Sequence, residues 1–297
     1  MLGVIAAEPD VHLAAAWDPD PSAVPAVLAP HAVRELETAI GRADAVVVLA
    51  PTDRRPEICV RAARAGRPVL VEKPVARTAG EARAVARELE RSRTPVMATL
   101  FLRELPALGR LRAVIRSGLL GRLSGATASY VHAGALDGTL AGPAAWMQDP
   151  RRAGVGGFGD LALHLVDAFS ALGAPPILEA ATLDRGRPGG VDLGGTAVGR
   201  WGEVPLGLRT SWVTRPAGFA LTVAGAAGTA VVRQGTLELT IPDGPAERWV
   251  GAPPDAGEAM RAFLERLRAR RFSRDALAPA ISAQEIIERA LRVTRAH

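Results

Sequence analysis

The sequence predicts an α/β protein: a doubly wound parallel sheet, followed by an α+β domain with an open, mostly antiparallel sheet. In the first hundred residues, unbroken apolar runs alternate with helical segments, which is typical of parallel strands buried on both faces. After about residue 121 the runs shorten, alternate between polar and apolar residues, and are separated by turn residues. We therefore expect two domains, at residues 1–120 and 121–297.

Four apolar runs are the expected parallel strands of the first domain: Val11–Trp17, Ala45–Ala50, Pro68–Val71 and Pro95–Leu100. A helix is expected at Asp53–Ala65, because Gly66 is a favourable residue just past a helix end. Another is expected at Ala79–Arg91, which opens on the capping box Thr78–Glu81. Strands spaced by helices of this size predict right-handed βαβ units.

Six short alternating runs are the expected strands of the second domain: Ala126–His132, Gly194–Trp201, Leu206–Trp212, Ala220–Val223, Thr229–Arg233 and Leu237–Ile241. Two helices are expected to close the chain, the second beginning at a capping box over Ser282–Glu285. This order of elements predicts an α+β domain.

Composition excludes several classes of protein. Cys59 is the only cysteine, so an intrachain disulfide is impossible and a reducing compartment is expected. The N-terminus has no basic segment, and no run reaches the length of a membrane span, so we expect a cytoplasmic protein without membrane partners. The net charge is only +5, and the sequence has one basic cluster, which comprises Arg266, Arg268, Arg270, Arg271 and Arg274. Such a cluster is typical of a solvated helix end, which argues against nucleic acid as a partner.

The glycine pattern of dinucleotide-binding folds occurs once, at Gly154–Gly159. It follows a polar segment and not a strand, so we interpret it as a loop entering a helix. In Rossmann folds an acidic residue also ends the second strand and binds the adenine ribose, and Asp18 fits that position. Counting back about 20 residues from Asp18 puts the glycines before Met1, so we expect the sequence to begin inside the first helix. Alternatively, Asp18 belongs to a polar turn.

Lys73 is the only lysine among 36 basic residues and follows the third apolar run, in the segment Val69–Val75. Ligands of open α/β sheets bind at the carboxyl ends of strands. A lysine ammonium is compact and can lose its proton, whereas a guanidinium is planar and permanently charged. Lys73 is therefore a candidate catalytic cation, with a surface lysine spared by chance as the alternative.

Asp160, His164 and Asp167 are spaced to form one stripe along a helix that is otherwise apolar. Aspartate one turn from histidine can orient the imidazole for proton transfer. The alternatives are a solvent-facing stripe or a satisfied buried pair. A metal site is disfavoured because no convincing further ligand accompanies the three residues.

The chain resembles the Gfo/Idh/MocA family of sugar and cyclitol oxidoreductases over nearly its whole length. The motifs that carry the resemblance are Glu72-Lys73-Pro74 and, much later, Asp160 followed by His164, preceded by a tryptophan and a glycine-rich loop. Three departures stand out: the glycine fingerprint is absent, Arg55 replaces the usual histidine, and Ala162 replaces the usual glycine.

The resemblance implies NAD(P)-dependent hydride transfer at a carbinol or ketone carbon of a sugar, nucleotide-sugar or cyclitol. It implies that Lys73 polarises the reacting oxygen, that His164 transfers the proton and that Asp160 orients or assists His164. The cofactor would lie near Ala50, Pro51, Thr52 and Glu72, and Asp18 would favour NAD over NADP. A homo-oligomer through the C-terminal sheet is expected. The alternative is a non-catalytic relative that serves as a binding or regulatory module.

Overall fold

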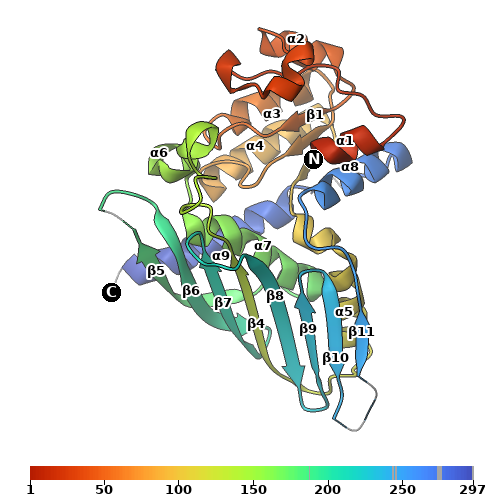
Figure 1. Cartoon of the computed structure of the whole chain (residues 1–297), viewed down its shortest axis with the longest axis vertical. Coiled ribbons are helices and arrows are strands. Elements are labelled where there is room, and N and C mark those ends of the chain that lie inside the picture. The colour runs from red at the N-terminus through yellow and green to blue at the C-terminus, as the bar shows by residue number, and fades with distance from the viewer. Residues whose placement is uncertain (187, 243, 245, 273–275, 296–297) are drawn as a thin grey trace.

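The computed structural model describes residues 1–186, 188–242, 244, 246–272 and 276–295, and Figure 1 shows a small α/β unit beside one broad, twisted sheet. The smaller unit contains a parallel sheet in the order β1-β2-β3, with the strands Val46–Val48, Val69–Val71 and Val96–Ala98. Its helices are α1 (Leu2–Ala7), α2 (Leu36–Arg42), α3 (Arg55–Arg64) and α4 (Ala79–Ser92). Three of the four predicted parallel strands and both predicted helices are thus confirmed.

The predicted strand at Val11–Trp17 is wrong, because only Ala16 makes a β-bridge, to Ala32. An apolar run becomes a strand only when a neighbouring segment pairs with it along its length. The chain that follows it folds into two short 3₁₀ helices, Pro21–Ala23 and Ala26–His31, and pairs with it only at Ala16. Their prolines lack the N–H that a ladder requires.

The larger sheet has the order β11-β10-β9-β8-β4-β7-β6-β5. All neighbouring strands are antiparallel except β4 and β7, as the predicted open, mostly antiparallel sheet requires. The strands are β4 (Leu123–Val131), β5 (Ile177–Arg185), β6 (Asp192–Trp201), β7 (Val204–Ser211), β8 (Gly218–Gly225), β9 (Thr229–Arg233), β10 (Thr236–Thr240) and β11 (Glu247–Trp249). Sequence analysis found all of them except β5 and β11.

Helices cover one face of this sheet (Figure 1). They are α5 (Pro106–Arg116), α7 (Gly157–Leu172) and α9 (Ala278–Arg295), while α8 (Gly257–Ala269) packs against α1 and against the short turn η3 (Phe101–Glu104). The turn η4 (Gly142–Gln148) and α6 (Pro150–Ala153) precede α7.

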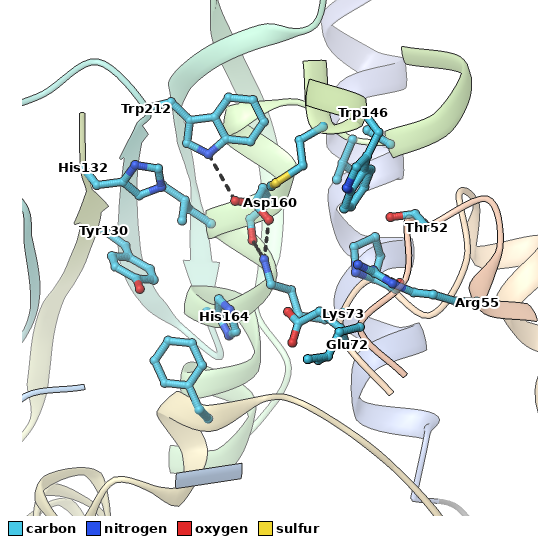
Figure 2. A pocket seen from close by; sticks show the side chains of 17 residues that line it. Thr52, Arg55, Glu72, Lys73, Tyr130, His132, Trp146, Asp160, His164 and Trp212 are labelled. Atoms are coloured by element: carbon cyan, nitrogen blue, oxygen red, sulfur yellow. Dashed lines mark hydrogen bonds and ion pairs between the residues drawn. The ribbon is translucent and has the colours of Figure 1, made fainter. Parts of the chain in front are cut away.

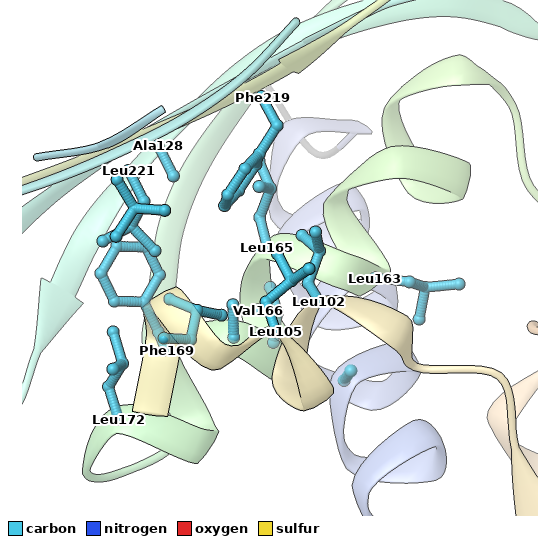
Figure 3. Close-up of a cluster of buried hydrophobic side chains, with 14 of the residues drawn as sticks. Leu102, Leu105, Ala128, Leu163, Leu165, Val166, Phe169, Leu172, Phe219 and Leu221 are labelled. Atoms are coloured by element: carbon cyan, nitrogen blue, oxygen red, sulfur yellow. The ribbon is translucent and has the colours of Figure 1, made fainter. Parts of the chain in front are cut away.

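The main core lies between the sheet and α7 (Figure 3). Every residue of α7 from Gly157 to Phe169 is buried, as its apolar sequence predicts. Phe169, Leu165 and Val166 on α7 face Phe219 and Leu221 on β8 within this core. Because the helix is held on all sides, polar residues on it are fixed in position.

Helix α9 begins at Ala278, four residues before the predicted start at Ser282. Pro279 is tolerated in a first helical turn, so the helix extends upstream through it. Glu285 then does not close a capping box and instead pairs with Arg83 of α4. The start of α9 and the residue before it also pack into the core of the small α/β unit, through Leu277, Ala280 and Ile281. The C-terminal segment is therefore in contact with the N-terminal part of the chain.

Two arginines of the basic cluster on α8 form ion pairs. Arg268 pairs with Glu8 and Asp10, and Arg266 pairs with Glu104. Arg274 lies outside the described residues.

One segment of the described chain, Pro150–Leu172, is long and apolar enough to cross a membrane by composition alone. Within this segment, 83% of the apolar 18-residue window is buried inside the protein. A central core helix has the same composition, so the segment is weak grounds for a membrane span.

Candidate active site

A cavity of about 300 Å³ lies where the carboxyl ends of β1 and β2 meet helix α7 and the ends of β4 and β7 (Figure 2). Five residues predicted from the sequence line it: Thr52, Glu72, Lys73, Asp160 and His164. The small α/β unit contributes the first three and helix α7 the other two. Lys73 and Asp160, which are 87 residues apart in the sequence, are thereby brought to one site.

Lys73 is held at the end of β2 by its backbone and by its side chain. Its backbone N–H donates to Thr99 Oγ1 at 3.1 Å, and its peptide bond to Pro74 is cis. Its side chain is 8% exposed, and its ammonium donates to the Asp160 backbone oxygen at 2.8 Å and forms an ion pair with Asp160 Oδ1. An ammonium has three N–H bonds, so one remains for a ligand in the cavity.

Asp160 joins this ion pair to the far wall of the cavity. Its second carboxylate oxygen, Oδ2, accepts a hydrogen bond from Trp212 Nε1 at 3.1 Å (Figure 2). Both oxygens are therefore committed to groups other than His164. The expectation that Asp160 orients His164 is corrected: one helical turn separates them, but the carboxylate turns toward Lys73, the stronger electrostatic partner.

His164 is buried on α7 with its ring against Phe101, at 4.4 Å between ring centroids. Burial, and the positive charge of Lys73, lower its pKa well below the usual value. The imidazole is therefore neutral near pH 7 and can accept a proton. Within the described chain its Nδ1 has no hydrogen-bond partner. An unpaired buried nitrogen is costly, which is expected where a ligand completes the site.

Asp167, the third residue of the predicted stripe, lies away from the cavity. It is fully buried and forms a two-fold ion pair with Arg103, with 2.8 Å between Arg103 Nε and Asp167 Oδ2. Burial raises the pKa of Asp167 despite this pairing. Two turns of helix carry it about 10 Å along the axis of α7, away from the cavity and beside η3, so it ties α7 to that turn.

Four more residues line the cavity, and sequence analysis gave none of them a role in the site: Tyr130, His132, Trp146 and Trp212. Tyr130 and His132 are two residues apart at the end of β4, so they project from the same face of the sheet. Tyr130 is the only tyrosine of the chain, and a unique polar residue at a strand end was the available signal. Burial, with the negative charges of Asp160 and Glu72, raises the pKa of Tyr130 to about 12, so it is a neutral donor.

His132 has a defined proton arrangement. Its Nδ1 accepts the backbone N–H of Gly134 at 2.9 Å, so a neutral ring carries its proton on Nε2. Burial lowers the pKa of His132, which favours that neutral form. His132 therefore offers the cavity a hydrogen-bond donor.

The remaining predicted cofactor residues lie outside the cavity lining. Ala50 accepts a hydrogen bond through its backbone oxygen from Arg55 Nε at 2.8 Å, and Pro51 accepts one from the backbone of Arg54. Asp18 Oδ1 accepts from the backbone N–H of Asp20 at 2.9 Å, which is the polar-turn alternative. The role of Asp18 in cofactor binding stays a prediction.

The glycine pattern at 154–159 serves close packing. A Cβ at Gly157 would lie 2.5 Å from the backbone carbon of Leu193, and one at Gly154 would lie 2.4 Å from the backbone oxygen of Arg77. Both glycines therefore allow backbones to touch where α7 begins. The interpretation as a loop entering a helix, and not a phosphate site, agrees with this packing.

Comparison with known proteins identifies the family. Residues 2–100 match the model described as oxidoreductase family, NAD-binding Rossmann fold, and residues 108–231 match the GFO/IDH/MocA C-terminal domain. The chain belongs to the Gfo/Idh/MocA family of oxidoreductases. Its cofactor is accordingly of the nicotinamide type. No group of three metal-binding side chains occurs among the described residues.

Three relatives are informative. Levoglucosan dehydrogenase of Pseudarthrobacter phenanthrenivorans is 31% identical over 170 residues, which span 54% of this chain and 42% of that protein, so less than half of the relative is matched. A 3-ketoreductase from Actinomadura kijaniata, solved with NADP and TDP-benzene, superposes with a TM-score of 0.82 at 18% identity, over 98% of this chain and 92% of that one. A levoglucosan dehydrogenase, solved as a complex with NADH and levoglucosan, superposes with a TM-score of 0.78 at 18% identity. The superposition covers 93% of this chain and 87% of that one.

The described residues fit the nicotinamide end of such a cofactor. Thr52 Oγ1 is buried at the cavity and has no partner in the part of the chain that the structure describes, so it is free to bond a carboxamide or hydroxyl. Glu72 and Lys73 flank it at the end of β2. For the adenine end, the only polar group that sequence analysis assigned is Asp18.

Proposed function

We propose that this protein transfers a hydride between a nicotinamide cofactor and a carbinol or ketone carbon of a sugar, nucleotide-sugar or cyclitol. The observation that carries the proposal is the convergence of Lys73, Asp160 and His164 on one cavity. The cofactor, when bound, supplies the hydride acceptor or donor. Thr52 and Glu72 lie where its nicotinamide end would be held.

In the oxidation direction, the free N–H of Lys73 donates a hydrogen bond to the substrate hydroxyl oxygen. His164, neutral because it is buried beside Lys73, accepts the hydroxyl proton as the C–H bond gives up its hydride. Lys73 stabilises the negative charge that develops on the oxygen. In the reverse direction the same imidazole, in its protonated form, returns the proton to the carbonyl oxygen.

Asp160 acts through Lys73. Its carboxylate and its backbone oxygen together fix the ammonium at the cavity wall. Trp212 Nε1 holds the carboxylate from the other side. The charge of Lys73 is thereby positioned before substrate arrives, which is the condition under which a charge stabilises a transition state most.

The test is the formation of NADH, followed by absorbance, with a panel of levoglucosan, inositols, hexoses and nucleotide sugars. His164→Asn is expected to lower the turnover number by roughly 100- to 10,000-fold, the range typical of a lost general base. His12→Asn is the matched control, because His12 is exposed. Normal turnover by His164→Asn would exclude this role, and binding of NAD without turnover of any compound would favour the non-catalytic alternative.

We also propose that NAD is preferred over NADP, on the basis of Asp18. Its carboxylate would repel a 2′-phosphate and accept a ribose hydroxyl. Titration of both cofactors into the wild type and Asp18→Asn is expected to show tighter NAD binding that the substitution diminishes. Equal affinities of the wild type for the two cofactors would contradict the assignment.

The outer face of the large sheet supports a homo-oligomer. Val198 on β6 is 58% exposed and Ile177 on β5 is 44% exposed, both apolar and near the same sheet edge. Light scattering is expected to give a mass above the 31.0 kDa of one chain, and Val198→Asp to lower it. A monomeric wild type would exclude this interface.

A further inference from the structure

A second cavity, called the distal hollow below, opens beside the active-site cavity. It has a volume of about 770 Å³ and is lined by residues of two segments, 132–139 after β4 and 215–217 before β8. His132 lines both spaces, so they share a wall. Figure 2 shows His132 across the active-site cavity from Thr52. The distal hollow therefore lies on the side away from the loop that would hold the cofactor.

The two segments that line the distal hollow are fixed to each other by backbone hydrogen bonds. The Thr214 N–H donates to His132 O at 3.1 Å, and the Ala135 N–H donates to Trp212 O at 3.0 Å. The indole of Trp212 in turn donates to Asp160 in the active-site cavity. Polar side chains on both segments are consequently held at set positions relative to the reacting centre.

The charged groups of the distal hollow are of opposite sign and lie apart from each other. Asp137 Oδ1 accepts hydrogen bonds from Thr139 Oγ1 at 2.6 Å and from the Thr139 N–H at 3.1 Å. These bonds, with Arg215 at longer range, lower the pKa of Asp137, so its carboxylate is charged at neutral pH. Within the described chain, no carboxylate lies within 4.0 Å of the Arg215 guanidinium, the limit for an ion pair. A ligand hydroxyl can therefore bond either group without breaking an ion pair.

We propose that the distal hollow binds a second sugar ring, which makes the substrate of this dehydrogenase a disaccharide. The inference rests on the proposed function for the active-site cavity. That cavity, at about 300 Å³, is at the small end of ligand sites, so it holds the reacting ring alone. The rest of the substrate extends past His132 into the distal hollow.

The chemistry of the distal hollow fits a neutral, hydroxyl-rich group better than a nucleotide. Sugar hydroxyls donate to a carboxylate and accept from a guanidinium, so Asp137 and Arg215 can both be used. A diphosphate would be attracted by Arg215 but repelled by Asp137. Among the described residues, none of those that line the hollow is phenylalanine, tyrosine or tryptophan, the rings on which proteins commonly stack a base.

The first experiment compares substrates of the wild type. NADH formation gives kcat/KM for D-glucose, maltose and cellobiose, for D-galactose, lactose and melibiose, and for UDP-glucose. The best disaccharide is expected to exceed the kcat/KM of its better constituent monosaccharide by about tenfold or more, because the second ring adds hydrogen bonds to two charged groups. Equal values for disaccharides and monosaccharides would overturn the proposal.

Variants then locate the effect. Arg215→Met and Asp137→Asn are each expected to lower the ratio of disaccharide to monosaccharide kcat/KM severalfold, and Arg112→Met, at an exposed arginine of α5, to preserve it. The ratio is measured because a loss of folded protein lowers both values alike. Asp137→Asn keeps an oxygen for the bonds from Thr139, so the segment keeps its shape. A ratio unchanged in both variants would overturn the assignment to this hollow.

The alternative occupant, a nucleotide, gives a different pattern in the same assays. UDP-glucose would then exceed every disaccharide in kcat/KM. Arg215→Met would lower that value, and Asp137→Asn would raise it, because the substitution removes the charge that repels the diphosphate. This pattern would make the proposal wrong.

Calorimetric titration of the same sugars with NAD present separates the inference from the proposed function. If monosaccharides are oxidised as well as disaccharides, the proposed function stands and the inference fails. If disaccharides bind at least about tenfold more tightly than their monosaccharides but no NADH forms, the second sugar site stands and the proposed function fails.

Discussion

The ion pair between Lys73 and Asp160 is the interaction whose removal has the most predictable consequence. Its side chains are only 8% and 10% exposed, so solvent screens the pair weakly. Asp160→Asn removes the charge but keeps the shape, and one amide oxygen must then serve either Lys73 or Trp212. Breaking a buried pair costs about 3–5 kcal/mol, a large part of a typical unfolding free energy of roughly 5–15 kcal/mol.

A double-mutant cycle measures the coupling directly. Asp160→Asn, Lys73→Met and the double variant are unfolded in urea and followed by tryptophan fluorescence. The double variant is expected to be more stable than the sum of the single effects predicts, by about 2–4 kcal/mol, because it leaves no unpaired buried charge. The exposed pair Arg77–Glu81 is the control, with a coupling below about 1 kcal/mol. A coupling at Lys73–Asp160 no larger than the control would refute the reasoning.

Three further predictions follow from the site. Lys73→Arg is expected to lower turnover by about a hundredfold or more, since a bulkier cation displaces the substrate by roughly an ångström; near-normal kinetics would contradict this. The pKa of His164 is lowered in the folded state, so the free energy of unfolding should fall as the pH drops below about 6.5, by at most about 1.4 kcal/mol per pH unit. His164→Asn should reduce that slope, as measured by urea unfolding between about pH 5 and 7. Gly157→Ala should lower the melting temperature, because the added Cβ clashes with the backbone of Leu193. The affinity of the remaining folded protein for NAD should be unchanged.

The residues that sequence analysis identified share a local signal. Lys73 is the sole lysine and follows a buried strand, and the spacing of Asp160 and His164 places them on one helix face. Such signals are readable because helix and strand periods fix which side chains share a face. For the same reason most strands of both sheets were found, since alternation and unbroken apolar runs reflect how many faces of a strand are buried.

What the sequence by itself determined is therefore most of the order of elements, together with the candidate residues Lys73, Asp160 and His164, which the fold brings to one cavity. The tertiary structure alone decided their partners. It turned Asp160 toward Lys73 and Trp212 and away from His164, it assigned Asp167 to Arg103, and it brought Trp146 over Arg55. It also left Val11–Trp17 without a strand to pair with. Such contacts join residues far apart in the chain, and their geometry depends on packing between elements, which no local period encodes.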